Sequence, residues 1–166
     1  VWAAVLALTL GGLATGYFLG AAVSRRYPTM KALFIIVLVA AMLVAAMPWT
    51  AAAIMEATLG LELRAGITIA CLVFLFPPLA CFGMVSPLII RLASVEENTA
   101  GHVAGKVYAI STLGGILATA LVAFYTIPFL GLWQTLLATA VLLAVVPLLY
   151  FTGALRHSSV GWASEA

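Results

Sequence analysis

The chain has 166 residues, of which 66% are hydrophobic and 7% are charged, with a mean hydropathy of +1.26. A soluble domain is about half apolar and about a quarter charged, so this composition excludes an ordinary water-soluble fold. The formal net charge is +2, and the Lys and Arg residues occur at the ends of hydrophobic runs. Charges in these positions set the orientation of membrane helices and do not form a patch suited to nucleic acid. We therefore predict an integral membrane protein that contacts the lipid bilayer.

Groups capable of catalysis or metal binding are scarce. The sequence has no Asp, and none of its five Glu residues falls at the centre of an apolar run. Cys71 and Cys81 share one apolar run but fall on different faces of a helix. We expect inert buried thiols, with a disulfide or metal pair as the alternative. No catalytic residue, cofactor or metal is predicted.

The first two hydrophobic runs predict spanning helices over about 1–23 and 32–47, since a crossing needs about 20 apolar residues. Because Val1 already lies inside an apolar run, a further helix before it is an expectation. Arg25 and Arg26 end the first run. Pro48 begins a less apolar connection, in which we expect a short interfacial helix at most.

The third run, about 67–90, contains three prolines. Each proline removes a backbone donor and disfavours helix at the residue before it, so we predict a third helix that is kinked or broken at these residues. The polar stretch from Arg91 to Lys106 follows and is predicted to be a loop. The prolines are Pro77, Pro78 and Pro87.

The fourth and fifth runs predict helices over about 107–127 and 133–151, joined by a tight turn at Pro128 and Gly131. The fold class is therefore all-α, a polytopic bundle of about five membrane-spanning helices in residues 1–155. Residues 156–166 form a short polar tail.

The Lys and Arg residues alternate between the two sides of this bundle. Three follow the first run, one the second, two the third, none the fourth and one the fifth. The positive-inside rule then places the Arg25-Arg26 loop, the Arg91 to Lys106 loop and the C-terminus in the cytoplasm and Val1 outside. A bacterial inner membrane is the predicted location.

Small residues recur at helical spacing in two runs. Gly12, Gly16 and Gly20 are four residues apart, a spacing that lets membrane helices approach closely. Helix packing is the favoured interpretation, and a cavity lined by Tyr17 and Gly20 is the alternative. The 107–127 run repeats the device, so we expect the first and fourth helices to touch. Its small residues are Ser111, Gly114, Gly115 and Ala118.

A few polar residues are candidates for binding. Arg91 is expected to extend to lipid headgroups or to cap carbonyls freed by Pro87, with an ion pair to a neighbouring Glu or ligand binding as alternatives. A lone His102 makes a poor metal site. The hydroxyls of Tyr108, Ser111 and Thr112 lie near the start of the fourth predicted helix. We expect them to form structural hydrogen bonds, with substrate contact as the alternative. The substrate-binding candidates are Tyr17, Ser86, Pro87, Arg91, Tyr108, Ser111 and Thr112.

A set of spaced residues resembles the membrane region of the spermidine synthase-like membrane proteins. Those proteins join a major-facilitator-like membrane part to an aminopropyltransferase-type domain. Two positions depart from the family pattern: Ser24 stands where Asp is usual, and Ala118 replaces a Gly. The resemblance rests on Gly12, Gly16-Tyr17, Gly20, Ser24-Arg25, Gly83-Met84-Val85-Ser86-Pro87, Arg91-Leu92, Gly101, Gly105, Tyr108-Ala109, Thr112, Gly114, Pro128, Gly131 and Thr135.

The resemblance implies a synthase domain that this segment does not supply. An aminopropyltransferase needs a Gly-rich turn for its nucleoside cosubstrate and aspartates for the amine, and the sequence has neither. Three functions stay open: a membrane module that anchors or accompanies such a domain, a small-metabolite transporter, and an accessory subunit of a membrane complex. The transporter, with polyamines among its candidate substrates, would act as a homo-oligomer or with a second membrane half.

Overall fold

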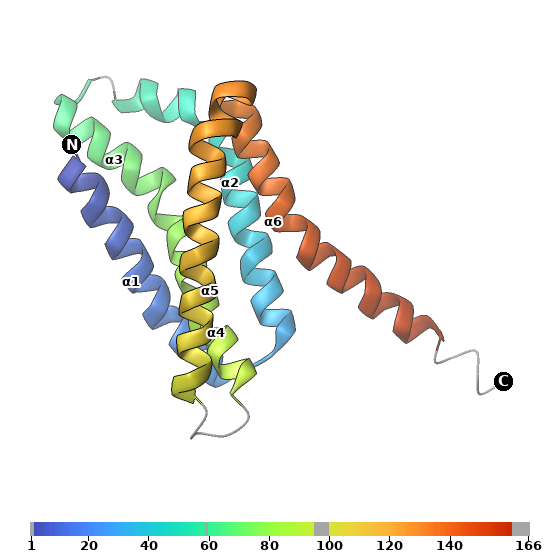
Figure 1. The fold of residues 1–166 in the computed structure, drawn as a ribbon. Coiled ribbons are helices and arrows are strands. Elements are labelled where there is room, and N and C mark those ends of the chain that lie inside the picture. Colours follow the sequence, from blue (N-terminus) through green and yellow to red (C-terminus); the bar gives the residue numbers. More distant parts are fainter. Residues whose placement is uncertain (1, 59, 95–99, 161–166) are drawn as a thin grey trace.

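The computed structural model describes residues 2–58, 60–94 and 100–160, and every regular element within these ranges is helical (Figure 1). Four apolar stretches are long enough to cross a membrane: Trp2–Arg26, Met30–Thr58, Phe76–Ala93 and Gly101–Gly153. The chain is therefore an integral membrane protein. Its elements are α1 (Trp2–Arg26), α2 (Met30–Thr58), α3 (Leu63–Phe74), α4 (Phe76–Ala93), α5 (Ala100–Leu121), the π-helix η2 (Val122–Thr126) and α6 (Ile127–Val160).

Helices α1 and α4 form the most extensive contact in the bundle, and they run in the same direction. Gly12 lies against Leu79, Gly16 against Gly83, and Gly20 against Pro87. Each four-residue step along α1 therefore matches a four-residue step along α4. The two helices are parallel neighbours although about 50 residues of chain separate them.

The remaining contacts arrange four helices in the order α1, α4, α2, α6. Helix α4 touches both α1 and α2, while α1 and α2 make no contact with each other within the described chain. Helices α2 and α6 are antiparallel, because the rings of Phe34 and Tyr150 are 4.5 Å apart and those of Trp49 and Trp133 are 5.2 Å apart. The core is thin, with Ala40, Ala41 and Ala140 beside Leu33, Val44 and Leu88.

Helix α5 stands in front of this row in Figure 1, and among the described elements it contacts α4 and η2. The last apolar stretch is not one straight helix, because Gly131 has φ 78° and ψ 169°. The chain turns back there, and glycine tolerates this conformation because it has no Cβ. The turn predicted at Pro128 and Gly131 thus lies at Gly131.

Two predicted boundaries are wrong. Helix α2 does not end near Met47 but continues through Pro48 to Thr58, because the proline costs a single backbone hydrogen bond within an otherwise strongly apolar helix. In Figure 1 the teal end of α2 lies across the top of the molecule. At the other end, α5 begins at Ala100, so His102 and Lys106 lie on a helix and not in a loop.

The predicted third run consists of α3 and α4, which meet at Leu75. Leu75 donates its N–H to the Cys71 carbonyl at 2.8 Å, and its own carbonyl accepts from Leu79 at 3.1 Å. Pro77 and Pro78 are in the first turn of α4, where a missing backbone donor is least costly. Pro87 lies inside α4.

Candidate functional site

The contact between α1 and α4 is close enough to exclude side chains at its centre. A Cβ on Gly16 would lie 2.8 Å from the Gly83 Cα, and one on Gly83 would lie 2.6 Å from the Leu13 carbonyl oxygen. A Cβ on Gly20 would lie 2.6 Å from both the Met84 Cα and the Pro87 ring. We call Gly12, Gly16, Gly20 and Gly83 the glycine seam.

The expected contact between the first helix and the 107–127 run is wrong, because α1 packs against α4 and does not touch α5. The residues of the α5 stripe are exposed, and a Cβ on Gly114 or Gly115 would meet no atom within 4 Å. Both runs carry small residues, but only the stripe on α1 has a partner within the described chain. The exposed α5 residues are Ser111, Gly114, Gly115 and Ala118.

Gly83 is a packing residue that the sequence interpretation missed. It lies on α4, and a Cβ on Gly16 would meet both it and the backbone of Ala80, three residues earlier. This pair of small residues at helical spacing was the available signal. Ser24 continues the seam at its far end and is 7% exposed, and its hydroxyl donates to the Ala21 carbonyl at 3.0 Å.

The substrate-binding candidates fall into two separate groups. Tyr17, Ser86, Pro87 and Arg91 belong to α1 and α4, while the other three belong to α5, which α1 does not touch. Tyr17 is 41% exposed and Arg91 is exposed at the end of α4. The α5 group is also exposed, and the Thr112 hydroxyl donates to the Tyr108 carbonyl at 2.8 Å. The seven candidates therefore lie on three helices, of which α4 contacts both α1 and α5; the α5 members are Tyr108, Ser111 and Thr112.

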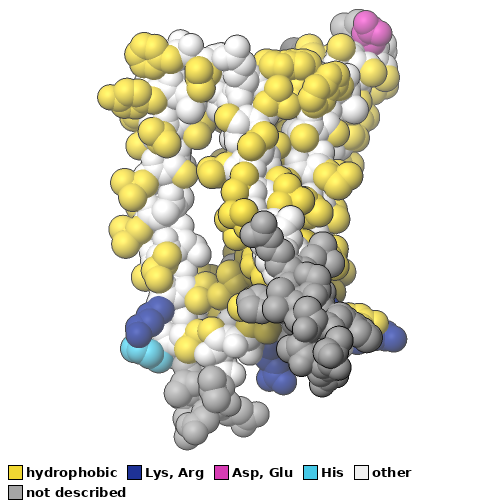
Figure 2. All heavy atoms as spheres, turned by 90° about the vertical axis from the view of Figure 1, so that its right-hand side faces the viewer, with side chains coloured by type: hydrophobic (Ala, Val, Ile, Leu, Met, Phe, Trp, Pro, Cys, Tyr) yellow, Lys and Arg dark blue, Asp and Glu magenta, His cyan; other side chains and the backbone are white. Residues whose placement is uncertain are grey.

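Basic side chains gather at one end of the bundle, which we call the basic end. Arg25 and Arg26 close α1, and Arg91 lies in the last turn of the parallel helix α4. Lys31 begins α2 and Lys106 lies near the start of α5. The two acidic side chains that the structure describes, Glu56 and Glu62, belong to the α2–α3 end, where Arg64 is a cation as well. Figure 2 shows acidic and basic side chains at opposite ends of the face in view.

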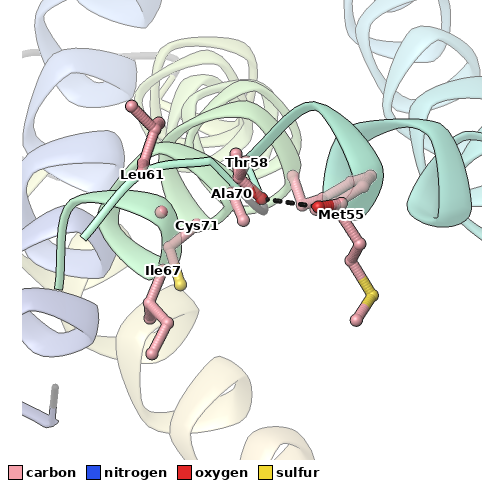
Figure 3. A pocket seen from close by; sticks show the side chains of 8 residues that line it. Met55, Thr58, Leu61, Ile67, Ala70 and Cys71 are labelled. Carbon is pink, nitrogen blue, oxygen red and sulfur yellow. Dashed lines mark hydrogen bonds between the residues drawn. The ribbon is translucent and has the colours of Figure 1, made fainter. Parts of the chain in front are cut away.

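A cavity of about 480 Å³ lies at the opposite end, between the end of α2 and α3 (Figure 3). Its only hydroxyl, from Thr58, donates to the Ile54 and Met55 carbonyls at 3.0 Å each. Cys71 lines the cavity as a free, half-buried thiol. The cavity is therefore apolar and suited to hydrocarbon. It is lined by Met55, Thr58, Leu61, Gly66, Ile67, Ala70, Cys71 and Phe74.

A second open cavity, of about 640 Å³, lies along α5 and η2. Thr112 is the candidate residue that lines it, together with Gly115 and Thr119. Within the ranges that the structure describes, no three His, Cys or acidic residues are grouped as a metal site requires. Comparison with protein-family models, with curated proteins and with solved structures gives no match.

Proposed function

We propose that this chain is a membrane module of a spermidine synthase-like protein and that its basic end holds an aminopropyltransferase-type domain at the cytoplasmic surface. The charge separation between the two ends carries the proposal. Positive-inside topology puts the basic end in the cytoplasm, and a bacterial inner membrane is the proposed location. The resemblance of the α1 and α4 sequences supplies the identity of the partner domain.

The same proposal has the chain cross the bilayer about five times. The stretch Gly101–Gly153 has 53 residues, which at 1.5 Å per residue is about 80 Å of helix, against about 30 Å of hydrocarbon. The turn at Gly131 divides this length into two arms. An odd number of crossings places the start of α1 and the end of α6 on opposite sides.

The test is whether the tagged chain, purified from its own membranes in mild detergent, carries aminopropyltransferase activity with it. The assay measures transfer of an aminopropyl group from the nucleoside cosubstrate to a diamine. The double variant R25Q/R26Q removes two exposed cations of the basic end and should lose most of that activity. R64Q, an exposed cation on α3, is the matched control and should retain it.

Two results would overturn the proposal. One is that the wild-type protein elutes without transferase activity in every preparation, and the other is that the R25Q/R26Q variant retains the full activity of the wild type. Because these arginines also direct topology, the variant's orientation is checked by the cysteine labelling described in the Discussion.

A small-metabolite transporter is the second candidate, and the prolines that follow the junction of α3 and α4 favour it, although the backbone stays helical through Leu75. Transporters often build substrate sites from discontinuous helices. The described carboxylates, Glu56 and Glu62, lie at one end of the bundle. Cation carriers usually place carboxylates deep in the membrane, so this arrangement counts against a cation carrier. Uptake of labelled polyamine into proteoliposomes above the level of empty vesicles would favour this function.

A further inference from the structure

Between α5 and the other helices there is an opening, which we call the crevice. Figure 2 shows it as an open gap between the column at its left, which is the helix α5 that stands in front in Figure 1, and the rest of the bundle. Helix α5 touches α4 near its start, where Val103 and Val107 are half-buried, but from Tyr108 to Leu121 every residue is exposed. The crevice is therefore bounded by the α4–α5 contact at one end and by η2 at the other.

The α5 wall of the crevice belongs to a helix with much exposed hydrocarbon, on which Ile110, Leu113 and Leu117 are 71%, 63% and 71% exposed. In a bilayer such surface is covered by lipid chains or by another apolar segment, because water there would gain no hydrogen bonds from it. The shape of the wall alone does not distinguish these occupants.

Charge distinguishes them. Arg91 at the end of α4 and Lys106 near the start of α5 are exposed on the two helices that meet at the foot of the crevice. Figure 2 shows Lys and Arg side chains on both sides of this foot. The neighbouring acidic residues in the sequence, Glu96 and Glu97, lie outside the described residues. An anionic headgroup complements these two cations, whereas an apolar helix does not.

We propose that the crevice holds an anionic phospholipid, with its headgroup phosphate bound by Arg91 and Lys106 and an acyl chain along α5. Basic pockets between helices at the cytoplasmic side recognise anionic headgroups in this way. The long side chains of Arg and Lys extend from the hydrocarbon boundary to the phosphate. This inference does not depend on the synthase domain, since it concerns the membrane side of the basic end.

The test titrates the purified full chain in phosphatidylcholine nanodiscs with phosphatidylglycerol and counts bound lipids by native mass spectrometry. Wild-type protein should prefer phosphatidylglycerol over added phosphatidylcholine. Each cation near the surface changes the affinity about fivefold, so R91Q/K106Q should weaken phosphatidylglycerol binding roughly 25-fold. The variant R91K/K106R keeps both charges and should bind as the wild type does.

R64Q removes an exposed cation from the other end of the bundle and should leave the affinity unchanged. Equal binding of the two lipids, or equal weakening by R64Q and R91Q/K106Q, would overturn the proposal. Inorganic phosphate that displaces the lipid at equal concentration would also overturn it, because the site would then recognise the free anion. Circular dichroism confirms that each variant is folded, and failure here leaves the transferase test untouched.

Discussion

At the scale of single residues, the glycine seam sets how closely α1 and α4 approach. A Cβ on Gly16 or Gly20 would overlap backbone atoms of α4, which cannot move aside as a flexible side chain does. Lipid tails are as apolar as the helices, so packing between membrane helices depends on such contacts. Stability at this position is therefore a matter of shape and not of hydrophobicity.

Gly16→Ala should lower the free energy of unfolding by about 1–3 kcal/mol, the usual cost of overpacking. The matched control is Gly114→Ala on α5, where an added Cβ meets open space and stability should stay the same or rise slightly through helix propensity. Unfolding of both variants in SDS titrations gives the comparison. Equal stability of the two variants would mean that the seam is not as tight as described.

At the scale of elements, α1 and α4 are parallel partners that the chain brings together across the intervening α2. Gly12 and Leu79 lie close together where the approach of α1 and α4 is less tight than at Gly16. A Cβ on Gly12 would lie 3.2 Å from the Leu79 Cβ. Disulfides join Cβ atoms about 3.5–4.5 Å apart. A pair of cysteines at these positions needs only a small adjustment to form a bond.

In a background with Cys71 and Cys81 changed to Ala, G12C/L79C should form a disulfide under mild oxidation. The pair G12C/G114C would join α1 to α5 and should stay reduced. Mobility on gels before and after reduction reports both. Cross-linking of the second pair in the monomer band would restore the pairing expected from sequence.

The turn at Gly131 was predictable from sequence, and the partner of the α1 stripe was not. A glycine three residues after a proline, between two apolar runs, indicates a turn. Small-residue stripes on both α1 and α5 were visible, but a stripe does not specify its partner. The continuation of α2 beyond Pro48 was missed because proline is tolerated within membrane helices.

At the scale of the whole molecule, the two ends differ in charge, which fixes a sidedness. Tyr27 lies between α1 and α2 at the basic end, and Gly60 lies between α2 and α3 at the other. Tyr27 is 55% exposed, and a Cβ on Gly60 meets no atom within 4 Å. Both positions are suited to chemical labelling.

In the background without Cys71 and Cys81, G60C should react with a membrane-impermeant maleimide in intact cells. Y27C should react only after the membrane is opened. The positive-inside rule is the physical reason, since the basic loops stay on the cytoplasmic side. The reverse pattern would place the basic end outside and remove the basis for a cytoplasmic partner domain.

The position of α4 between α1 and α2 has a consequence for biosynthesis. Because α1 and α2 make no contact with each other in the described chain, the α1–α2 hairpin, which the ribosome makes before α4, has no interface of its own. The glycine face of α1 gains its partner only when α4 has been inserted between α1 and α2. The α1–α2 pair therefore cannot pack in the order in which its helices are made, because the helix that contacts both is made later.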